Sequence, residues 1–321
     1  MHSFGIKERP FSKQATRVIL AVLIVLNILV FALLFSKNML GLLNVNVSPQ
    51  LKIDFVNVGQ GDCCLIRTPK GRTFVIDGGT NVSEEDAKKL GRELIYKYVQ
   101  KLNIKKIDGV VVTHWHVDDF SGLIPLIKQS DVSCVYETPI GFINEFYNDF
   151  DEACKNKNVK RISVTAGNVL EWGDELFVQV LNPEDIFGSA LHSEINNDAI
   201  VLLVRYGKVQ VLLCADIQED AEREVIKFNE GIKSQIIKIP DHGAERSAYK
   251  PFFKLVGAQD GIISVGANNK FGYPSVKALD LFEELGMKIY RTDKNGNIHL
   301  SIGGKDEKDY SIAVDYNRIL D

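Results

Sequence analysis

The sequence predicts a mixed α/β domain of the α+β type that begins near residue 51 and follows one long apolar segment. Short runs rich in valine, isoleucine and leucine alternate with segments whose apolar residues recur at a helical period. Several of these runs end at an aspartate or a histidine. Residues 18–35 are almost entirely apolar. These observations set the fold class, the domain boundary and the region where a functional site is expected.

Composition places the chain among globular proteins. Its 321 residues are 45% hydrophobic and 25% charged, which allows a large buried core. The net charge is −4, but residues 1–17 carry +3 (four basic side chains, one acidic), which leaves −7 for the remainder. Nucleic-acid binding depends on cationic contacts with phosphates, so an acidic body is not typical of a nucleic-acid binder. It does not exclude a nuclease, because bound cations would reverse the local field.

The five cysteines are expected to be free or buried thiols. Their number is odd and no CxxC spacing occurs, which argues against a disulfide framework or a zinc knuckle. Cys63 and Cys64 lie within a predicted strand, so their side chains should point to opposite faces of the sheet.

The apolar segment over residues 18–36 is predicted to be an uncleaved transmembrane anchor. Asn27 is the only polar side chain from residue 18 to 35, and this length reaches the lower limit for a membrane-spanning helix. A buried helix and a cleaved signal peptide are the alternatives. The positive-inside rule then predicts a basic cytoplasmic tail (1–17), a linker (37–50) and an extracellular domain (51–321). The expected localisation is the cell membrane, crossed once.

The first half of the domain is predicted to be a β-meander followed by alternating helices and strands. Glycine-rich turns at 59–62 and 69–71 separate three apolar runs. Ser83 is a candidate N-cap for the first helix. We expect strands at 52–58, 63–67, 73–76, 107–112 and 132–136, and helices at 83–102, 121–128 and 142–155.

The second half continues the mixed pattern. Gly207 marks a hairpin turn between two apolar runs, and Ser275 is a candidate N-cap of the last helix. We expect strands at 175–181, 199–204, 209–213, 235–239, 261–265, 288–290 and 298–302, the last two closing the sheet, and helices at 219–228 and 275–285.

Residues 110–122 carry the clearest functional signal. Three valines end a predicted strand, and His114, His116, Asp118 and Asp119 follow within a few positions. Imidazole nitrogen and carboxylate oxygen together suit Zn²⁺, Mn²⁺ or iron better than Ca²⁺, which prefers oxygen ligands only. The alternative is a polar loop with solvated charges. Only six histidines occur in the chain, which favours the metal interpretation.

Other potential ligands also follow predicted strands. Asp77, Asp216 and His242 each come just past an apolar run, so we expect them near the same edge as His114. Asp216 could instead cap the next helix, and Asp62 could simply cap its turn.

These motifs resemble the metallo-β-lactamase superfamily, and within it the extracellular hydrolase domain of ComEC-type DNA-uptake proteins. The resemblance covers residues 51–302 and is carried by Phe55–Asp62, Phe74–Gly79, Thr113–Gly122, Leu212–Asp216, Lys238–Gly243 and Asn268–Ser275. It implies a four-layer αβ/βα sandwich with up to two metal ions at one edge. By matching positions, His114 and His116 would hold the first ion, Asp118 and His242 would contribute to the second, and Asp216 would bridge them.

The sequence departs from the family pattern at several positions. Asp119 and Asp241 stand where histidines are expected, Tyr273 replaces another histidine, and Ala215 replaces a glycine. Carboxylates can still bind metal, so the centre would be richer in oxygen and shifted from Zn²⁺ towards Mn²⁺ or Mg²⁺. Alternatively, the second metal site has degenerated. Asp119 is counted among the predicted metal ligands. The residues that would either bind metal or hydrogen-bond a metal ligand are Asp241, Asp62, Asp77 and Asp198 (beside Asn197).

The resemblance implies a metal-dependent hydrolase that uses a metal-activated water. One or two divalent ions per chain are expected, and Zn²⁺ and Mn²⁺ are the favoured metals. Asp118 and Asp216 are the predicted catalytic residues. Candidate substrate-binding residues are Lys238, Asn268, Asn269 and Tyr273, although Lys238 could equally be an outward strand residue. A phosphodiesterase or nuclease outside the membrane, acting on nucleic acid or another phosphodiester, is the expected activity. The alternatives are a membrane-tethered binding or regulatory module with a degenerate site, and a lactam, lactone or thioester hydrolase.

Overall fold

The computed structural model describes residues 13–35, 49–79, 94–139, 145–173, 175–184 and 195–316. The chain divides into two units, residues 1–48 and 49–321. The first contains α1 (Lys13–Phe35), whose described side chains are exposed and, over 18–31, mostly apolar. Over the described residues, no helix is both long and apolar enough to cross a membrane. The anchor over 18–36 therefore stays a prediction.

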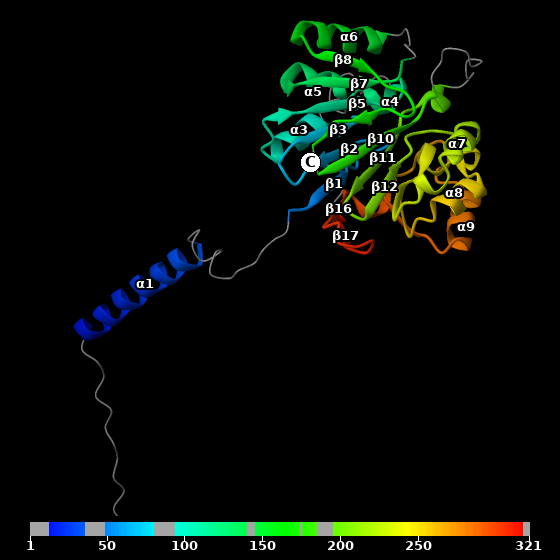
Figure 1. The fold of residues 1–321 in the computed structure, drawn as a ribbon. Coiled ribbons are helices and arrows are strands. Elements are labelled where there is room, and N and C mark those ends of the chain that lie inside the picture. Colours follow the sequence, from blue (N-terminus) through cyan, green and yellow to red (C-terminus); the bar gives the residue numbers. More distant parts are fainter. Residues whose placement is uncertain are drawn as a thin grey trace, which may run out of the picture. The chain divides into compact units, whose positions relative to one another are not determined.

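The second unit is a sandwich of two β-sheets with helices on both outer faces (Figure 1). The first sheet has eight strands, in the order β17 (Tyr310–Val314), β16 (Ile298–Ile302), β1 (Leu51–Phe55), β2 (Cys64–Arg67), β3 (Thr73–Ile76), β5 (Gly109–Val112), β7 (Cys134–Glu137) and β8 (Lys160–Ser163). The second has seven, in the order β15 (Lys288–Arg291), β14 (Asp260–Ile263), β13 (Ile236–Lys238), β12 (Val209–Leu213), β11 (Val201–Tyr206), β10 (Leu176–Asn182) and β9 (Val169–Leu170).

Helices cover the outer face of each sheet. The first sheet is covered by α3 (Leu94–Lys101), α5 (Leu123–Gln129) and α6 (Glu145–Lys157), and the second by α7 (Glu219–Val225), α8 (Lys250–Val256) and α9 (Val276–Glu284). Shorter elements are α4 (Val117–Phe120), α10 (Thr292–Asn295) and the 3₁₀ turns η2 (Ile195–Asp198), η3 (Ile226–Ile232), η4 (Pro240–Gly243) and η5 (Glu245–Ser247). The predicted four-layer α/β sandwich is confirmed.

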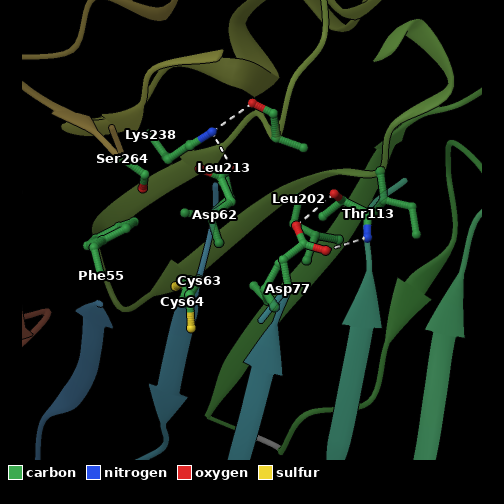
Figure 2. A pocket seen from close by; sticks show the side chains of 13 residues that line it. Phe55, Asp62, Cys63, Cys64, Asp77, Thr113, Leu202, Leu213, Lys238 and Ser264 are labelled. Atoms are coloured by element: carbon green, nitrogen blue, oxygen red, sulfur yellow. Dashed lines mark hydrogen bonds and ion pairs between the residues drawn. The ribbon is translucent and has the colours of Figure 1, made fainter. Parts of the chain in front are cut away.

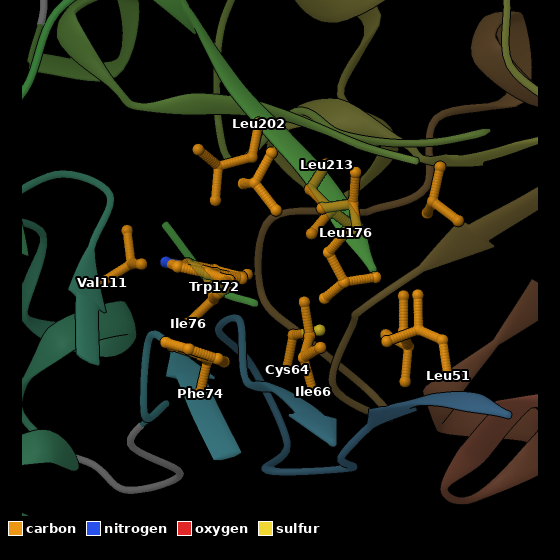
Figure 3. Packing of buried hydrophobic residues seen from close by; sticks show 14 of the residues in the cluster. Leu51, Cys64, Ile66, Phe74, Ile76, Val111, Trp172, Leu176, Leu202 and Leu213 are labelled. Carbon is orange, nitrogen blue, oxygen red and sulfur yellow. The ribbon is translucent and has the colours of Figure 1, made fainter. Parts of the chain in front are cut away.

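Alternation of side chains along the strands divides the interior into three apolar layers. Phe74 and Ile76 of β3 face the second sheet, whereas Val75 between them faces the helices. The layer between the sheets includes Trp172, whose ring stacks on Phe74 with centroids 4.1 Å apart (Figure 3). Cys64 joins this layer and its neighbour Cys63 the helix-side layer, as predicted, and all five cysteines are free.

Several predicted elements differ from the structure. Ile107 does not extend β5; it belongs to β4 (Lys106–Ile107), which pairs with β6 (Asp131–Val132) in a separate two-stranded sheet. Residues 288–290 and 298–302 do not close one sheet, because β15 edges the second sheet and β16 joins the first. Strands β8, β9 and β17 and helix α8 were not predicted. The start of the helix predicted from Ser83 lies outside the described residues.

Parallel pairing directs the potential ligands to the junction of the two sheets. Strands β3, β5 and β7 run parallel in the first sheet, and β12, β13 and β14 run parallel in the second. Asp77 and His114 follow the first set, and Asp216 and His242 follow the second. A hydrogen bond from Ile200 N to Thr113 O (2.9 Å) ties the start of β11 to the end of β5 at this junction.

Candidate metal centre

Trp115 anchors the segment that carries the central histidines. Its side chain is buried among the helices, with edge contacts to Phe120, Tyr147 and Phe150 at centroid distances of 5.2, 4.7 and 5.6 Å. The residues on either side, His114 and His116, then meet each other, with Nε2 and Nδ1 3.1 Å apart. The segment predicted as a loop in fact enters the one-turn helix α4 after His116.

Glycines allow the neighbouring turns to lie directly against this segment. The backbone N–H groups of Gly78 and Gly79 both donate to the carbonyl oxygen of Asp119, each at 2.7 Å. A side chain at Gly122 would begin 2.2 Å from Gly78 O, and one at Gly61 would begin 2.1 Å from Asp118 O. These close approaches fix the backbone that carries Asp118 and Asp119.

Asp77 and Thr113 orient the His114 ring. Asp77 accepts hydrogen bonds from the backbone N and the hydroxyl of Thr113, at 3.0 and 2.7 Å (Figure 2). The Thr113 oxygen is also 3.0 Å from His114 Nδ1. Burial raises the pKa of Asp77 to about 8. When the carboxylate is ionised, the hydroxyl donates to it and accepts from Nδ1–H, which leaves the Nε2 lone pair directed at the other site residues.

His242 is presented by two successive residues in left-handed backbone conformation. Asp241 and His242 have φ of 44° and 53°, an arrangement that costs energy and concentrates at functional sites. His242 Nδ1 donates to the carbonyl oxygen of Ser264 (2.8 Å), and Nε2 lies 3.3 Å from Asp216 Oδ2. The ring is thus held with Nε2 towards the centre.

Among the residues that the structure describes, three overlapping groups of side chains could each hold a metal ion. Within each group the ligand atoms lie within 4.8 Å of one another; the groups are His114–His116–Asp119–Asp216, Asp62–Asp216–His242 and Asp118–Asp119–His242. Three residues, Asp119, Asp216 and His242, each belong to two groups, and a carboxylate among them could bridge two ions. Buried carboxylate oxygens of Asp62 (Oδ1), Asp119 (Oδ2) and Asp216 (Oδ1) have no hydrogen-bond partner among the described residues. Divalent cations would satisfy these atoms, so the residues present fit a metal centre.

The charges of the centre are strongly perturbed. Burial, with the charges of Asp216 and Asp118 nearby, raises the pKa of Asp119 well above its usual value. Burial also raises the pKa of Asp62. Burial lowers the pKa of His114 to about 3, which keeps its imidazole neutral as a metal ligand requires. Although burial opposes it, the charge of Asp216 raises the pKa of His242 to about 9. Without a divalent cation, this site therefore crowds more carboxylates together than can ionise easily.

Lys238 is buried inside the centre rather than directed outward. Its Nζ pairs with Asp62, lies 3.5 Å from Asp216 Oδ1 and donates to the carbonyl oxygen of Ala215 at 2.8 Å (Figure 2). Its charge therefore faces Asp216 Oδ1 without a hydrogen bond to that oxygen, while Oδ2 faces His114 and His242. A cavity of about 20 Å³, lined in part by Asp62, Asp77 and Lys238, lies beside it and has room for about one water molecule.

The remaining candidate residues lie at different places around the centre. Asp241 belongs to none of the three groups, and its Oδ2 accepts from Arg246 and Ser247. Asp198 is buried in η2, just before β11. Asn268 is exposed, whereas the side chain of Asn269 hydrogen-bonds the backbone of Gly266 and Tyr273 and so braces its own loop.

The Tyr273 ring lies against His242, with centroids 6.4 Å apart at 30°. Sequence reasoning missed Arg246, Thr113 and Ser264. Thr113 stood within the recognised motif, but nothing in the sequence singled out the other two.

The fold and the candidate metal centre are typical of the metallo-beta-lactamase superfamily. The model of the metallo-beta-lactamase superfamily matches residues 56–266, so the chain belongs to this superfamily. Within it, the chain is similar to ComEC-like competence proteins. ComE operon protein 3 of Bacillus subtilis (strain 168) is 28% identical over 262 residues, which cover 78% of this chain and 33% of that protein. Competence protein ComA of Neisseria gonorrhoeae is 22% identical over 248 residues, covering 77% and 32%.

The chain thus spans about a third of the length of these relatives. Among solved structures, the metallo-beta-lactamase fold protein YhfI from Bacillus subtilis superposes with a TM-score of 0.50 at 13% identity. The match covers 75% of this chain and 96% of that one. This likeness shows the fold. A metal-dependent hydrolase is the activity class that the superfamily and the candidate metal site suggest.

Proposed function

We propose that the chain is a metal-dependent hydrolase that cleaves a phosphodiester bond with a metal-activated water. The observation that carries this proposal is the set of buried carboxylate oxygens of Asp62, Asp119 and Asp216 that lack hydrogen-bond partners, beside two neighbouring histidines. Bound divalent ions would lower the pKa of a water molecule and stabilise charge that develops on the phosphoryl oxygens.

The residues of the chain bind the metal ions, orient the attacking water and accept its proton. The side chains of His114, His116, Asp119, Asp216, Asp118 and His242 hold the ions. Asp118, half-buried at the rim, orients the attacking water and accepts its proton. Attack forms one P–O bond and breaks the ester P–O bond, and the leaving oxygen takes up a proton from solvent water, while Asp118 returns its own proton to solvent. Lys238, fully engaged with Asp62 and Asp216, holds the bridging carboxylate and does not reach the substrate.

The ligand set favours a harder ion than an all-histidine centre would. Asp119 supplies a carboxylate where the family pattern has an imidazole, which moves preference from Zn²⁺ towards Mn²⁺. We propose one or two ions per chain.

We further propose that residues 18–36 anchor the protein in the cell membrane, with the N-terminus in the cytoplasm and the hydrolase domain outside. The uninterrupted apolar sequence and the basic residues before it support this topology. The name of one relative, Competence protein ComA, refers to competence, and we propose nucleic acid as the first phosphodiester to test. External protease applied to cells that carry a tag at each terminus tests the topology, because only the C-terminal tag should be cleaved.

Hydrolysis of bis(p-nitrophenyl) phosphate and of a single-stranded oligonucleotide by the 321-residue chain tests the activity. We expect turnover with Mn²⁺ or Zn²⁺, and a loss of about 100-fold or more in His116→Ala and Asp216→Ala. Asp306→Ala, at an exposed aspartate in the turn before β17, is the matched control. Hydrolysis of a lactone, lactam or thioester in place of the diesters would assign another reaction. Full metal occupancy without turnover of any of them would favour a binding module.

A further inference from the structure

Arg246 is held at the rim of the metal centre by the carboxylate that stands in place of a family histidine. Asp241 is almost completely buried, and its Oδ2 accepts hydrogen bonds from Arg246 Nε (2.7 Å) and Ser247 Oγ (3.2 Å). The Arg246 side chain itself is 55% exposed. The carboxylate is therefore committed to the arginine, while the arginine still faces solvent.

The backbone places this pair next to the ligands. Asp241 N donates to the carbonyl oxygen of Ala215, the residue before Asp216, and Asp241 directly precedes His242. Asp241 holds Arg246 by its Nε, and the ring of the neighbouring His242 faces Tyr273, with centroids 6.4 Å apart. Tyr273 in turn stacks on Phe271, with ring centroids 5.6 Å apart, and forms an apolar wall there.

Arg246 retains unused hydrogen-bonding capacity. Only Nε is engaged, and among the described residues neither terminal nitrogen has a hydrogen-bond partner. The pair gives the buried Asp241 carboxylate the partner that it needs, but this requires only one of the N–H groups of the guanidinium. A planar guanidinium with free N–H groups is suited to two oxygens of one phosphate.

The crowded carboxylates of the centre would also make a cation at its rim favourable for binding an anionic substrate. The carboxylates of the centre are crowded, with Asp118 half-buried at the rim and Asp62, Asp119 and Asp216 buried behind it. Lys238 is buried as well and is already paired. A negatively charged diester approaching from solvent would be repelled wherever bound metal does not compensate. Arg246 is a cation beside the centre that is exposed and keeps terminal N–H groups without a hydrogen-bond partner among the described residues.

We propose that Arg246 binds a non-bridging oxygen of the phosphodiester substrate, and that Asp241 is a positioning residue for Arg246 and not a metal ligand. The proposal rests on the phosphodiester hydrolysis proposed above. It gives a physical reason for the aspartate at position 241, where the family pattern has a histidine. The aspartate does not bind metal; it positions an arginine that binds an anion.

The test compares Arg246→Gln, Arg246→Lys and Asp241→Asn with wild type. We expect KM for bis(p-nitrophenyl) phosphate to rise about 10- to 100-fold in Arg246→Gln, with a smaller change in kcat. The KM of Arg246→Lys should lie between those of wild type and Arg246→Gln, and Asp241→Asn should also raise KM. Arg205→Gln is the matched control, because Arg205 is an exposed arginine at the hairpin end of β11, over Phe177. An unchanged KM in Arg246→Gln would overturn the proposal.

Metal content separates the two roles of Asp241. Elemental mass spectrometry should find the same number of ions in Asp241→Asn as in wild type, whereas a lost ion would make Asp241 a ligand and overturn the proposal. If wild type hydrolyses no diester, the proposed function fails by itself. Calorimetric titration of the metal-loaded protein with inorganic phosphate then still tests the arginine, because Arg246→Gln should weaken phosphate binding about tenfold, and equal binding would count against it.

Discussion

Replacing Thr113 with valine tests whether the Asp77–Thr113–His114 contacts orient the His114 ring. The hydroxyl lies between Asp77 Oδ2 (2.7 Å) and His114 Nδ1 (3.0 Å), and all three residues are at most 2% exposed. Valine has nearly the same shape but can neither donate nor accept a hydrogen bond. Both partners would then be buried without this contact.

Two quantities should change in Thr113→Val. Leaving a buried polar group unpaired costs about 1–3 kcal/mol, so the metal-free protein should lose about 2–5 kcal/mol of unfolding free energy. Metal affinity should fall about 10- to 100-fold, because the imidazole loses the group that fixes its orientation. Urea denaturation of chelator-treated protein measures the first quantity, and competition with a chromophoric chelator measures the second.

Thr292→Val is the control for stability alone. Thr292 is also buried, and its hydroxyl bridges the backbone N (2.8 Å) and O (3.0 Å) of Val265, outside the three donor groups. It should destabilise the protein without weakening metal binding, and Thr113→Ser should restore most of both properties. Metal affinity in Thr113→Val within twofold of wild type would refute the role assigned to the Asp77–Thr113–His114 contacts.

Three further changes have defined outcomes. The raised pKa of His242, about 9, means that its pair with Asp216 stabilises the metal-free protein fully below pH 6.5 and is lost as pH rises through 9. The stability difference between wild type and His242→Gln, from urea denaturation, should therefore shrink by at most about 3 kcal/mol between pH 6 and 9.5. Asp119→Asn should stabilise the metal-free protein by about 1 kcal/mol at pH 8, since a crowded carboxyl becomes neutral, yet should lower the metal count. Gly122→Ala, which would place its Cβ 2.2 Å from a backbone carbonyl oxygen, should cost about 3 kcal/mol in urea denaturation, whereas Gly231→Ala, with nothing within 4 Å, should cost far less.

Local patterns were sufficient to predict the parts of the fold that local physics determines. The valine run before His114 and the apolar run before Asp216 form strands β5 and β12, with the ligands just beyond them. Ser275 caps α9 as predicted, since its hydroxyl accepts from Ala278 N at 3.1 Å. In each case the apolar run or the capping residue that marks the element is local in the sequence, although β5 itself pairs with the more distant strands β3 and β7.

Partners that meet only in the folded chain were not predictable. Whether β16 pairs with β1 or with β15 depends on the path of the chain after α10, which no periodicity records. Asp241 was a candidate ligand because of its position, but its actual partner, Arg246, could be recognised only once η4 and η5 placed the two side chains together. The sequence likewise could not distinguish Lys238 from an outward strand residue. Only the folded second sheet shows that its side chain is buried.

Metal content of the purified chain tests the central claim most directly. Elemental mass spectrometry after reconstitution with Mn²⁺ and Zn²⁺ should find one or two ions per chain. The count should fall in Asp216→Ala, because Asp216 belongs to two of the three donor groups. A wild-type chain that holds no ion under these conditions, while remaining folded, would contradict the account.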